Sequence, residues 1–177
     1  MKLILVGFMG SGKTTISKLL GEKLNLDVRD LDQEIVKYTQ LSINDIFKNK
    51  GEAYFRKLEY DLLQKQTSFS GILATGGGTI MNDNCLEYVS YGDTPVILLD
   101  MLDEDIKKRL GSKNGRPIAS LKTTDELIEL KHKRDSRYHR VANLIINTNS
   151  KQPEVIVSEI MFFLNKNKIG DNSGTRR

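Results

Sequence analysis

Short runs of apolar residues recur along the chain and alternate with longer stretches in which apolar residues repeat at helical spacing. Such runs are typical of strands that are buried on both faces of a parallel sheet and covered by helices. We therefore predict an α/β fold around a central, five-stranded parallel sheet. The predicted strands are Leu3–Val6, a strand around Val28 within Leu26–Leu31, Ile72–Ala74, Val96–Leu99 and Leu144–Ile146.

Helical patterns fill the gaps between these strands. Ser42 before Asp45, and Thr123 or Thr124 near Glu126, are signals for helix N-caps. The polar tail from Asn165 onward is nearly free of apolar residues, so we expect it to fray. The predicted helices are Thr15–Leu24, Asp32–Tyr38, Ser42–Lys48, Glu52–Gln64, Asp103–Leu110, Thr124–Val141 and Pro153–Leu164.

The composition is that of an ordinary globular protein with one core. The chain has 177 residues, of which 38% are hydrophobic and 28% charged, and this sets disordered and fibrous classes aside. No linker or internal repeat divides it. We expect a single domain over residues 1–166 and a disordered tail over residues 167–177.

Charge and cysteine content narrow the possible functions. The net charge of +4 comes from 27 basic and 23 acidic residues, so a nucleotide or a small carboxylate satisfies the excess as well as nucleic acid would. The single cysteine, Cys85, excludes an intramolecular disulfide and a multi-cysteine zinc site within one chain. Apolar runs are too short for a membrane span, and no cleavage site follows the first one, so we expect a cytoplasmic protein.

The most informative motif lies directly after the first predicted strand. Residues 7–14 match the phosphate-loop pattern G-x-x-x-x-G-K-[ST], and a predicted helix follows. Glycines let backbone N–H groups converge on phosphate oxygens, and the helix N-terminus adds its positive dipole end. Lys13 supplies a cation and Thr14 a hydroxyl for magnesium. The nucleotide-binding residues expected here are Gly10, Ser11, Gly12, Lys13, Thr14 and Thr15.

Four further clusters follow the other predicted strands, at the edge where open α/β sheets bind ligands. The clusters are Asp30-Leu31-Asp32, Gly51 to Glu59, Gly76-Gly77-Gly78, and Gly115-Arg116-Pro117 with Arg134 to Tyr138. Their order and spacing resemble shikimate kinase from about Lys2 to Pro153. The resemblance implies a three-layer phosphate-loop NTPase fold like that of nucleoside monophosphate kinases, with a substrate-binding segment at about 32–60 and a mobile lid at about 111–123.

Asp30 and Asp32 lie two positions apart, which on an extended segment places both side chains on one face. Two like charges there favour a bound cation. The resemblance implies that Asp30 reaches Mg²⁺ through water, beside Thr14, and that Asp32 accepts or orients the proton of the acceptor hydroxyl. From the residues alone, a turn with a helix N-cap is the alternative.

Arg56 lies within helical reach of two acidic residues, Glu52 and Glu59. A carboxylate that holds a guanidinium leaves it organised as a fork for a planar carboxylate. The resemblance implies that Arg56 and Arg134 bind the substrate carboxylate and that Glu59 supports Arg56. A solvated ion pair, worth at most about 1 kcal/mol, is the alternative.

Three consecutive glycines, Gly76, Gly77 and Gly78, permit a backbone path closed to side chains and leave their amides free to approach a ligand. The resemblance places them against the substrate hydroxyls; a flexible turn is the alternative.

The resemblance also assigns residues on the nucleotide side. It makes Arg116 the lid arginine that closes over the transferring phosphate, although an ordinary solvent-facing charge fits the pattern too. Arg109 resembles an adenine-contacting arginine, and Asn147–Pro153 resembles the adenine loop, with Pro153 at its end. Ile118-Ala119 follow Arg116-Pro117 where the family usually has two leucines, which affects how the lid packs.

These assignments imply a kinase that transfers the γ-phosphoryl group of magnesium ATP to the 3-hydroxyl of shikimate, on the route to chorismate and aromatic amino acids. Lys13, Asp32 and Arg116 would be catalytic, and no covalent intermediate is needed. The resemblance favours a monomer. Two other functions stay open, namely a related kinase acting on another hydroxylated acid such as gluconate, and a nucleotide-controlled binding module without turnover. Nucleic-acid binding is disfavoured because the basic residues are diffuse.

Several polar residues elsewhere are expected to have no part in the site. His132 and His139, on one basic helix, lack metal-ligand spacing, and Arg137 and Arg140 fit surface charges. Asp100 fits a turn or cap, and Cys85 a small buried side chain. The apolar run Met161-Phe162-Phe163-Leu164 is expected to belong to the core.

Overall fold

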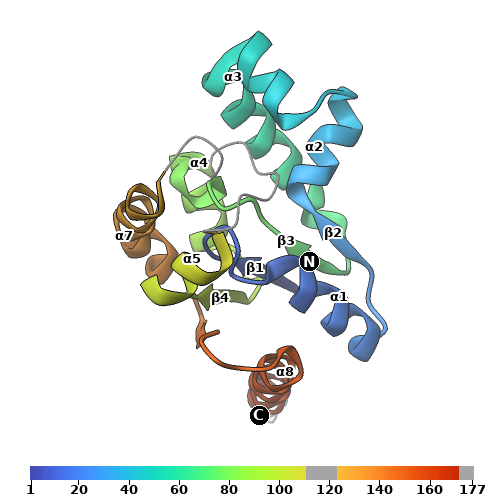
Figure 1. The fold of residues 1–177 in the computed structure, drawn as a ribbon. Coiled ribbons are helices and arrows are strands. Elements are labelled where there is room, and N and C mark those ends of the chain that lie inside the picture. The colour runs from blue at the N-terminus through green and yellow to red at the C-terminus, as the bar shows by residue number, and fades with distance from the viewer. Residues whose placement is uncertain (111–122, 172–177) are drawn as a thin grey trace.

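The computed structural model describes residues 1–110 and 123–171, which form a parallel sheet with helices on both faces (Figure 1). The sheet has five strands in the order β2-β3-β1-β4-β5, and every neighbouring pair is parallel. The predicted five-stranded parallel sheet is therefore confirmed. The strands are β1 (Leu3–Val6), β2 (Val28–Asp30), β3 (Ile72–Ala74), β4 (Val96–Asp100) and β5 (Leu144–Asn147).

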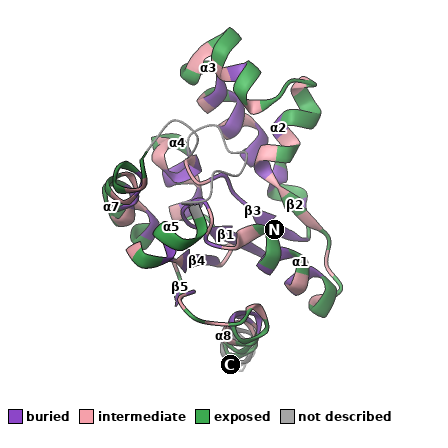
Figure 2. Cartoon of the chain, viewed as in Figure 1, coloured by how far each residue is buried: buried purple, intermediate pink, exposed green. Residues whose placement is uncertain are grey.

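The alternation of side chains along each strand divides the core into two parts. In β1, Leu3 and Leu5 point to one face, whereas Ile4 and Val6 point to the other. Burial on both faces explains why the three central strands β3, β1 and β4 are apolar runs, whereas the edge strand β2 contains Arg29 and Asp30. Figure 2 shows the same distribution, with buried residues concentrated on the sheet and on the helix faces turned toward it.

The first face is covered by α1 (Lys13–Leu24) and α8 (Pro153–Asp171), whose Leu20 and Ile160 are fully buried. The opposite face is covered by the helices between β2 and β5, which supply the larger of the two apolar clusters. These helices are α2 (Leu31–Thr39), α3 (Ile43–Lys65), α4 (Asp83–Tyr91), α5 (Asp103–Leu110) and α7 (Thr124–Val141), with short 3₁₀ turns η1 (Gln66–Ser68) and η2 (Thr79–Met81).

The two helices predicted on either side of Gly51 are confirmed: both belong to α3, which is interrupted by a kink at Gly51, whose φ of 81° and ψ of 170° are not helical. The helix prediction was wrong in two places. Helix α4 was not predicted, because its sequence carries only a short apolar pattern after the 3₁₀ turn. Helix α8 continues to Asp171, beyond the predicted end at Leu164, because polar residues extend a helix that its buried first turns already anchor.

Both predicted N-caps are confirmed. The Ser42 side chain accepts a hydrogen bond from the Asp45 N–H at the start of α3. Thr123, rather than Thr124, caps α7 and forms a reciprocal capping box with Glu126.

Candidate active site

A cavity of about 660 Å³ lies at the carboxyl edge of the sheet, where β1, β2 and β3 end. Its volume suits a small-molecule site. Segments that are far apart in the sequence converge there because all strands are parallel and their carboxyl ends share one edge. The predicted site residues that line it are Gly10, Gly12, Lys13, Thr14, Thr15, Asp30, Asp32, Arg56, Glu59, Gly76, Gly77, Gly78 and Arg134.

The phosphate loop has the conformation that its glycines permit. Gly7, Gly10 and Gly12 have φ of 144°, 80° and 95°, values that L side chains rarely adopt. Helix α1 begins directly after Gly12, so the N-terminus of α1 opens on the cavity. The Lys13 ammonium donates to the carbonyls of Gly7 at 2.7 Å and Phe8 at 3.0 Å. These hydrogen bonds fix the positive charge of Lys13 beside the first residues of the loop.

Of the six nucleotide-binding residues predicted at the phosphate loop, Ser11 is the one that does not line the cavity. Its side chain is buried, and its hydroxyl has no hydrogen-bond partner among the described residues.

Asp30 and Asp32 meet in the cavity, but not for the reason predicted. Asp30 ends β2 and Asp32 lies in the first turn of α2, so the two do not share an extended segment. The Asp30 carboxylate caps α2 by accepting from the N–H groups of Asp32 at 3.0 Å and Gln33 at 3.4 Å. The N-cap alternative is thus correct for Asp30, while the cavity position of both residues agrees with the functional prediction.

The environment of Asp32 raises its pKa from 3.8 to about 6. Burial is the main cause, and the neighbouring carboxylates Asp30 and Glu59 add to it, whereas Lys13 and Arg56 oppose it. A carboxylate with a pKa close to neutral is suited to take up a proton during a reaction at physiological pH.

We expect Asp32→Asn to raise the free energy of unfolding of the ligand-free protein at pH 7 to 8. The pKa of Asp32 is higher in the folded protein than in the unfolded chain. The contribution of this difference to the free energy of unfolding is therefore fully present below about pH 4 and is lost as the pH rises through about 6. Asparagine is not subject to this loss. Urea unfolding at pH 4 and pH 7.5 tests this, and an equal effect of the substitution at both pH values would contradict it.

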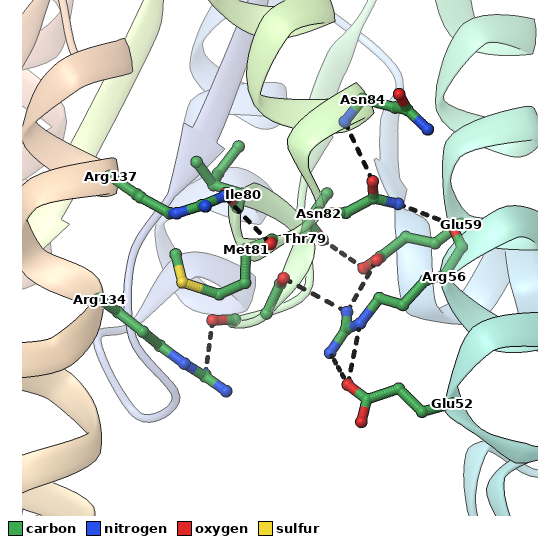
Figure 3. A network of polar contacts seen from close by, with 12 residues as sticks. Glu52, Arg56, Glu59, Thr79, Ile80, Met81, Asn82, Asn84, Arg134 and Arg137 are labelled. Carbon is green, nitrogen blue, oxygen red and sulfur yellow. Dashed lines mark hydrogen bonds and ion pairs between the residues drawn. The ribbon is translucent and has the colours of Figure 1, made fainter.

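Arg56 is held on three sides (Figure 3). Its Nη1 donates to Glu59 Oε2 at 2.8 Å and to the Gly78 carbonyl at 3.3 Å, and its Nη2 donates to Glu52 Oε1 at 3.2 Å. Glu59 is only 1% exposed, so the pair is not the solvated surface contact considered as the alternative. The Asn82 side chain also donates to the Arg56 carbonyl at 2.8 Å and fixes the helix backbone.

Arg134 reaches the cavity from α7, on the other side of the glycine loop (Figure 3). Its Nη1 donates to the Gly77 carbonyl at 2.8 Å, and its guanidinium lies 5.9 Å from the Phe8 ring centroid. One turn earlier on α7, Lys131 pairs with Asp100 at 3.2 Å and fastens the helix to the end of β4. Asp100 also accepts from the Met101 N–H, as expected of a turn residue.

The three glycines between β3 and η2 are needed for space rather than for an unusual backbone path. None of them has a positive φ, and crowding at each Cβ position closes the backbone path to side chains, as predicted. A Cβ on Gly76 would lie 2.6 Å from Asp32 Oδ1, one on Gly77 3.2 Å from the Met9 N–H nitrogen, and one on Gly78 2.9 Å from an Arg56 nitrogen. The carboxylate, the phosphate loop and the arginine can therefore approach this loop only because side chains are absent.

On the nucleotide side, Arg109 joins two loops. It donates to the carbonyls of Gly10 in the phosphate loop and Thr148 in the predicted adenine loop, both at 3.3 Å. Arg109 and Pro153, the first residue of α8, do not line the cavity itself. Arg116 and most of the predicted lid lie outside the described residues.

Sequence reasoning missed the apolar wall of the cavity. Met9, Ile43, Phe47 and Phe55 line it beside the charged residues. Met9 occupies an unspecified position of the phosphate-loop pattern, and the spacing of Ile43, Phe47 and Phe55 on α3 is that of an ordinary core pattern. A planar ring or an aliphatic skeleton bearing polar groups suits a cavity with one apolar wall and several charged groups.

The donor set fits a divalent metal shared with phosphates rather than one held by protein alone. In residues 1–110 and 123–171, no three His, Cys, Asp or Glu residues are grouped to hold a metal ion. Thr14, Asp30 and Asp32 nevertheless line one cavity, and the pKa of Asp32 is raised mainly by burial and further by the nearby carboxylates Asp30 and Glu59. A hard cation completed by water and phosphate oxygens would balance that charge.

Outside the cavity, Arg137 is a surface charge, as predicted: its side chain is 35% exposed, donates to the Met81 carbonyl at 3.1 Å and pairs with Asp83 at 2.6 Å. One prediction there was wrong. Phe162 is 72% exposed and does not belong to the core, unlike its partly buried neighbours Met161 and Phe163. His132 and His139 are exposed and Cys85 is buried, as predicted. Within the described part of the chain, no helix is long and apolar enough to cross a membrane.

Comparison with known proteins identifies the family. The family model for shikimate kinase matches residues 9–165. A shikimate kinase from Limosilactobacillus fermentum is 45% identical over 165 residues, which is 93% of this chain and 95% of that protein.

Solved structures agree with this match. The structure of shikimate kinase from Acinetobacter baumannii in complex with shikimate superposes with a TM-score of 0.85 at 32% identity, over 94% of this chain and 93% of that one. The structure of shikimate kinase from Aquifex aeolicus gives a TM-score of 0.78 at 34% identity, over 96% of this chain and 99% of that one. The phosphate-loop kinase fold is thus confirmed, and the chain belongs to the shikimate kinase family.

Proposed function

We propose that this chain transfers the γ-phosphoryl group of Mg²⁺-ATP to the 3-hydroxyl of shikimate, giving shikimate 3-phosphate and ADP, on the route to chorismate and aromatic amino acids. One observation carries the proposal. The phosphate loop with Lys13 and the two arginines, Arg56 and Arg134, line one cavity together with Asp32. A triphosphate and a small carboxylic acid would therefore meet in one cavity, which also contains Asp32, a carboxylate whose pKa of about 6 suits a base.

The mechanism rests on positioning and electrostatics. Arg56 and Arg134 bind the substrate carboxylate as planar forks, which presents the ring hydroxyls to Asp32 and the glycine loop. Asp32 accepts the hydroxyl proton while the substrate oxygen bonds to the γ-phosphorus and the bond to the β–γ bridging oxygen breaks. Lys13, and by resemblance Arg116, neutralise charge on the phosphate oxygens.

Magnesium is the metal that we propose for this site. Thr14 would bind it directly and Asp30 through water, and phosphate oxygens and water would supply the remaining ligands. When bound, the ion neutralises phosphate charge and aligns the β- and γ-phosphates. Arg109, Pro153 and the backbone of residues 10–12 would bind the nucleotide.

The remaining expectations extend this proposal. We propose that residues 1–166 act as one kinase domain with its substrate-binding segment at about 32–60 and its lid at about 111–123, and that the protein is a cytoplasmic monomer without nucleic-acid or membrane partners.

Purified protein assayed for ADP release in parallel with shikimate and with gluconate tests the function. We expect turnover that depends on shikimate and on a divalent cation, and none above background with gluconate. Turnover with gluconate instead would support the related-kinase alternative. Calorimetry that shows nucleotide binding, without ADP release on either acid, would support a binding module.

A further inference from the structure

The two arginines that face the cavity are spaced by the same short loop. Arg56, from α3, donates to the Gly78 carbonyl, and Arg134, from α7, donates to the Gly77 carbonyl (Figure 3). Both guanidinium groups are therefore hydrogen-bonded to neighbouring peptide units of one loop. Any shift of this loop would change the distance between the two forks that bind one carboxylate.

A buried hydroxyl fixes the Arg56 side of this arrangement. Thr79, the first residue of η2, is fully buried, and its Oγ1 donates to Glu59 Oε1 at 2.7 Å. The other oxygen of Glu59 accepts from Arg56 at 2.8 Å. Thr79 thus holds the Glu59 carboxylate in the one rotation that presents Oε2 to Arg56, directly beside the loop (Figure 3).

A second buried hydroxyl fixes the Arg134 side. Tyr138 lies one turn after Arg134 on the same face of α7, and it is 2% exposed. Its hydroxyl donates to the same Gly77 carbonyl that accepts from Arg134. That carbonyl therefore stays bound to α7 through Tyr138 even when Arg134 turns toward a ligand.

The geometry points to Thr79 and Tyr138 as positioning residues, whose hydroxyls set the spacing of Arg56 and Arg134 for the substrate carboxylate. This inference rests on the proposed function. Neither hydroxyl lines the cavity, so both act through the arginines and the loop rather than by touching substrate. Loss of either protein hydroxyl should therefore weaken binding of the substrate's charged carboxylate and leave recognition of the substrate's hydroxyl groups unchanged.

Steady-state kinetics of Thr79→Val with shikimate and with its methyl ester tests the inference. Valine keeps the shape but removes the donor, which leaves Glu59 Oε1 unpaired, and we expect kcat/KM for shikimate to fall about tenfold. The kcat/KM for the ester, which lacks the anionic carboxylate, should fall far less. The ratio of kcat/KM for shikimate to kcat/KM for the ester should therefore fall. The KM for ATP should stay unchanged, and Thr79→Ser, which keeps the hydroxyl, should restore the ratio.

Tyr138→Phe provides an independent second variant if Thr79→Val does not fold. It removes only a hydroxyl, and we expect the same fall in the shikimate-to-ester ratio, but smaller, because Arg134 still binds the Gly77 carbonyl. Equal losses for both substrates in the two variants, or an unchanged ratio, would overturn the inference. Absence of shikimate turnover in the wild-type protein would instead overturn the proposed function, before any variant is compared.

Discussion

Replacing Asp32 by asparagine is expected to lower kcat for shikimate phosphorylation by about 10²- to 10⁴-fold, the range for loss of a general base. Asparagine keeps the size of the side chain beside Gly76, where space is tight, but cannot accept the hydroxyl proton. Binding of substrate through the arginines should persist, so KM should change much less than kcat. Single-turnover measurements at saturating ATP and shikimate would separate the two.

The pH profile of the wild-type enzyme gives a second measure of the same role. A base acts in its ionised form, so kcat/KM for shikimate should fall as pH drops below about 6, the pKa raised by burial of Asp32. Glu34→Gln is the matched control, because Glu34 lies on the same helix but pairs with Lys37 and does not line the cavity. Retention of most of kcat in Asp32→Asn would exclude Asp32 as the base.

Arg56→Ala is expected to raise KM for shikimate by about 100-fold or more while leaving ATP affinity nearly intact. Truncating one partner of a hydrogen-bonded charge pair costs about 2 to 5 kcal/mol, and each 1.4 kcal/mol corresponds to about tenfold in affinity. Arg56 contacts Glu59, Glu52 and the Gly78 carbonyl, none of which belongs to the phosphate loop. Initial rates with varied shikimate, together with calorimetry for nucleotide, test the separation.

Two controls make this result interpretable. Arg56→Ala leaves the buried Glu59 with Thr79 as its remaining side-chain donor, so a thermal melt must show that the variant is folded at the assay temperature. Arg140→Ala removes an exposed arginine from α7 and should change neither affinity. Equal loss of shikimate and ATP affinity in a folded Arg56→Ala variant would count against the assignment of Arg56 to the acid.

Local features of the chain were predictable because they depend on neighbours in the sequence. The five strands, the phosphate loop, the Ser42 cap and the start of α7 at Thr124 follow from apolar runs, glycines and capping side chains. The break at Gly51 was also predictable, because glycine readily adopts the non-helical backbone that kinks α3 there. Helix α4 was missed because its apolar pattern is short.

The site was predictable in its members but not in their contacts. A motif and a family resemblance placed Lys13, Asp32, Arg56 and Arg134 together, and the cavity lining agrees. Nothing in the sequence indicated Thr79, whose hydroxyl acts on a residue 20 positions away. Tyr138 stood within a noted cluster, but its partner Gly77 lies 61 positions away.

The sequence by itself determined the five strands, the described α-helices other than α4, the phosphate loop and the kinds of charged residue that the site contains. Only the tertiary structure decided three further features. Glu59 is buried against Arg56, the two arginines donate hydrogen bonds to adjacent backbone carbonyls, and Asp32 has a pKa of about 6. Periodicity and capping depend on residues a few positions apart, which the sequence displays. Burial and charge coupling depend on segments that meet only when parallel strands bring their ends to one edge.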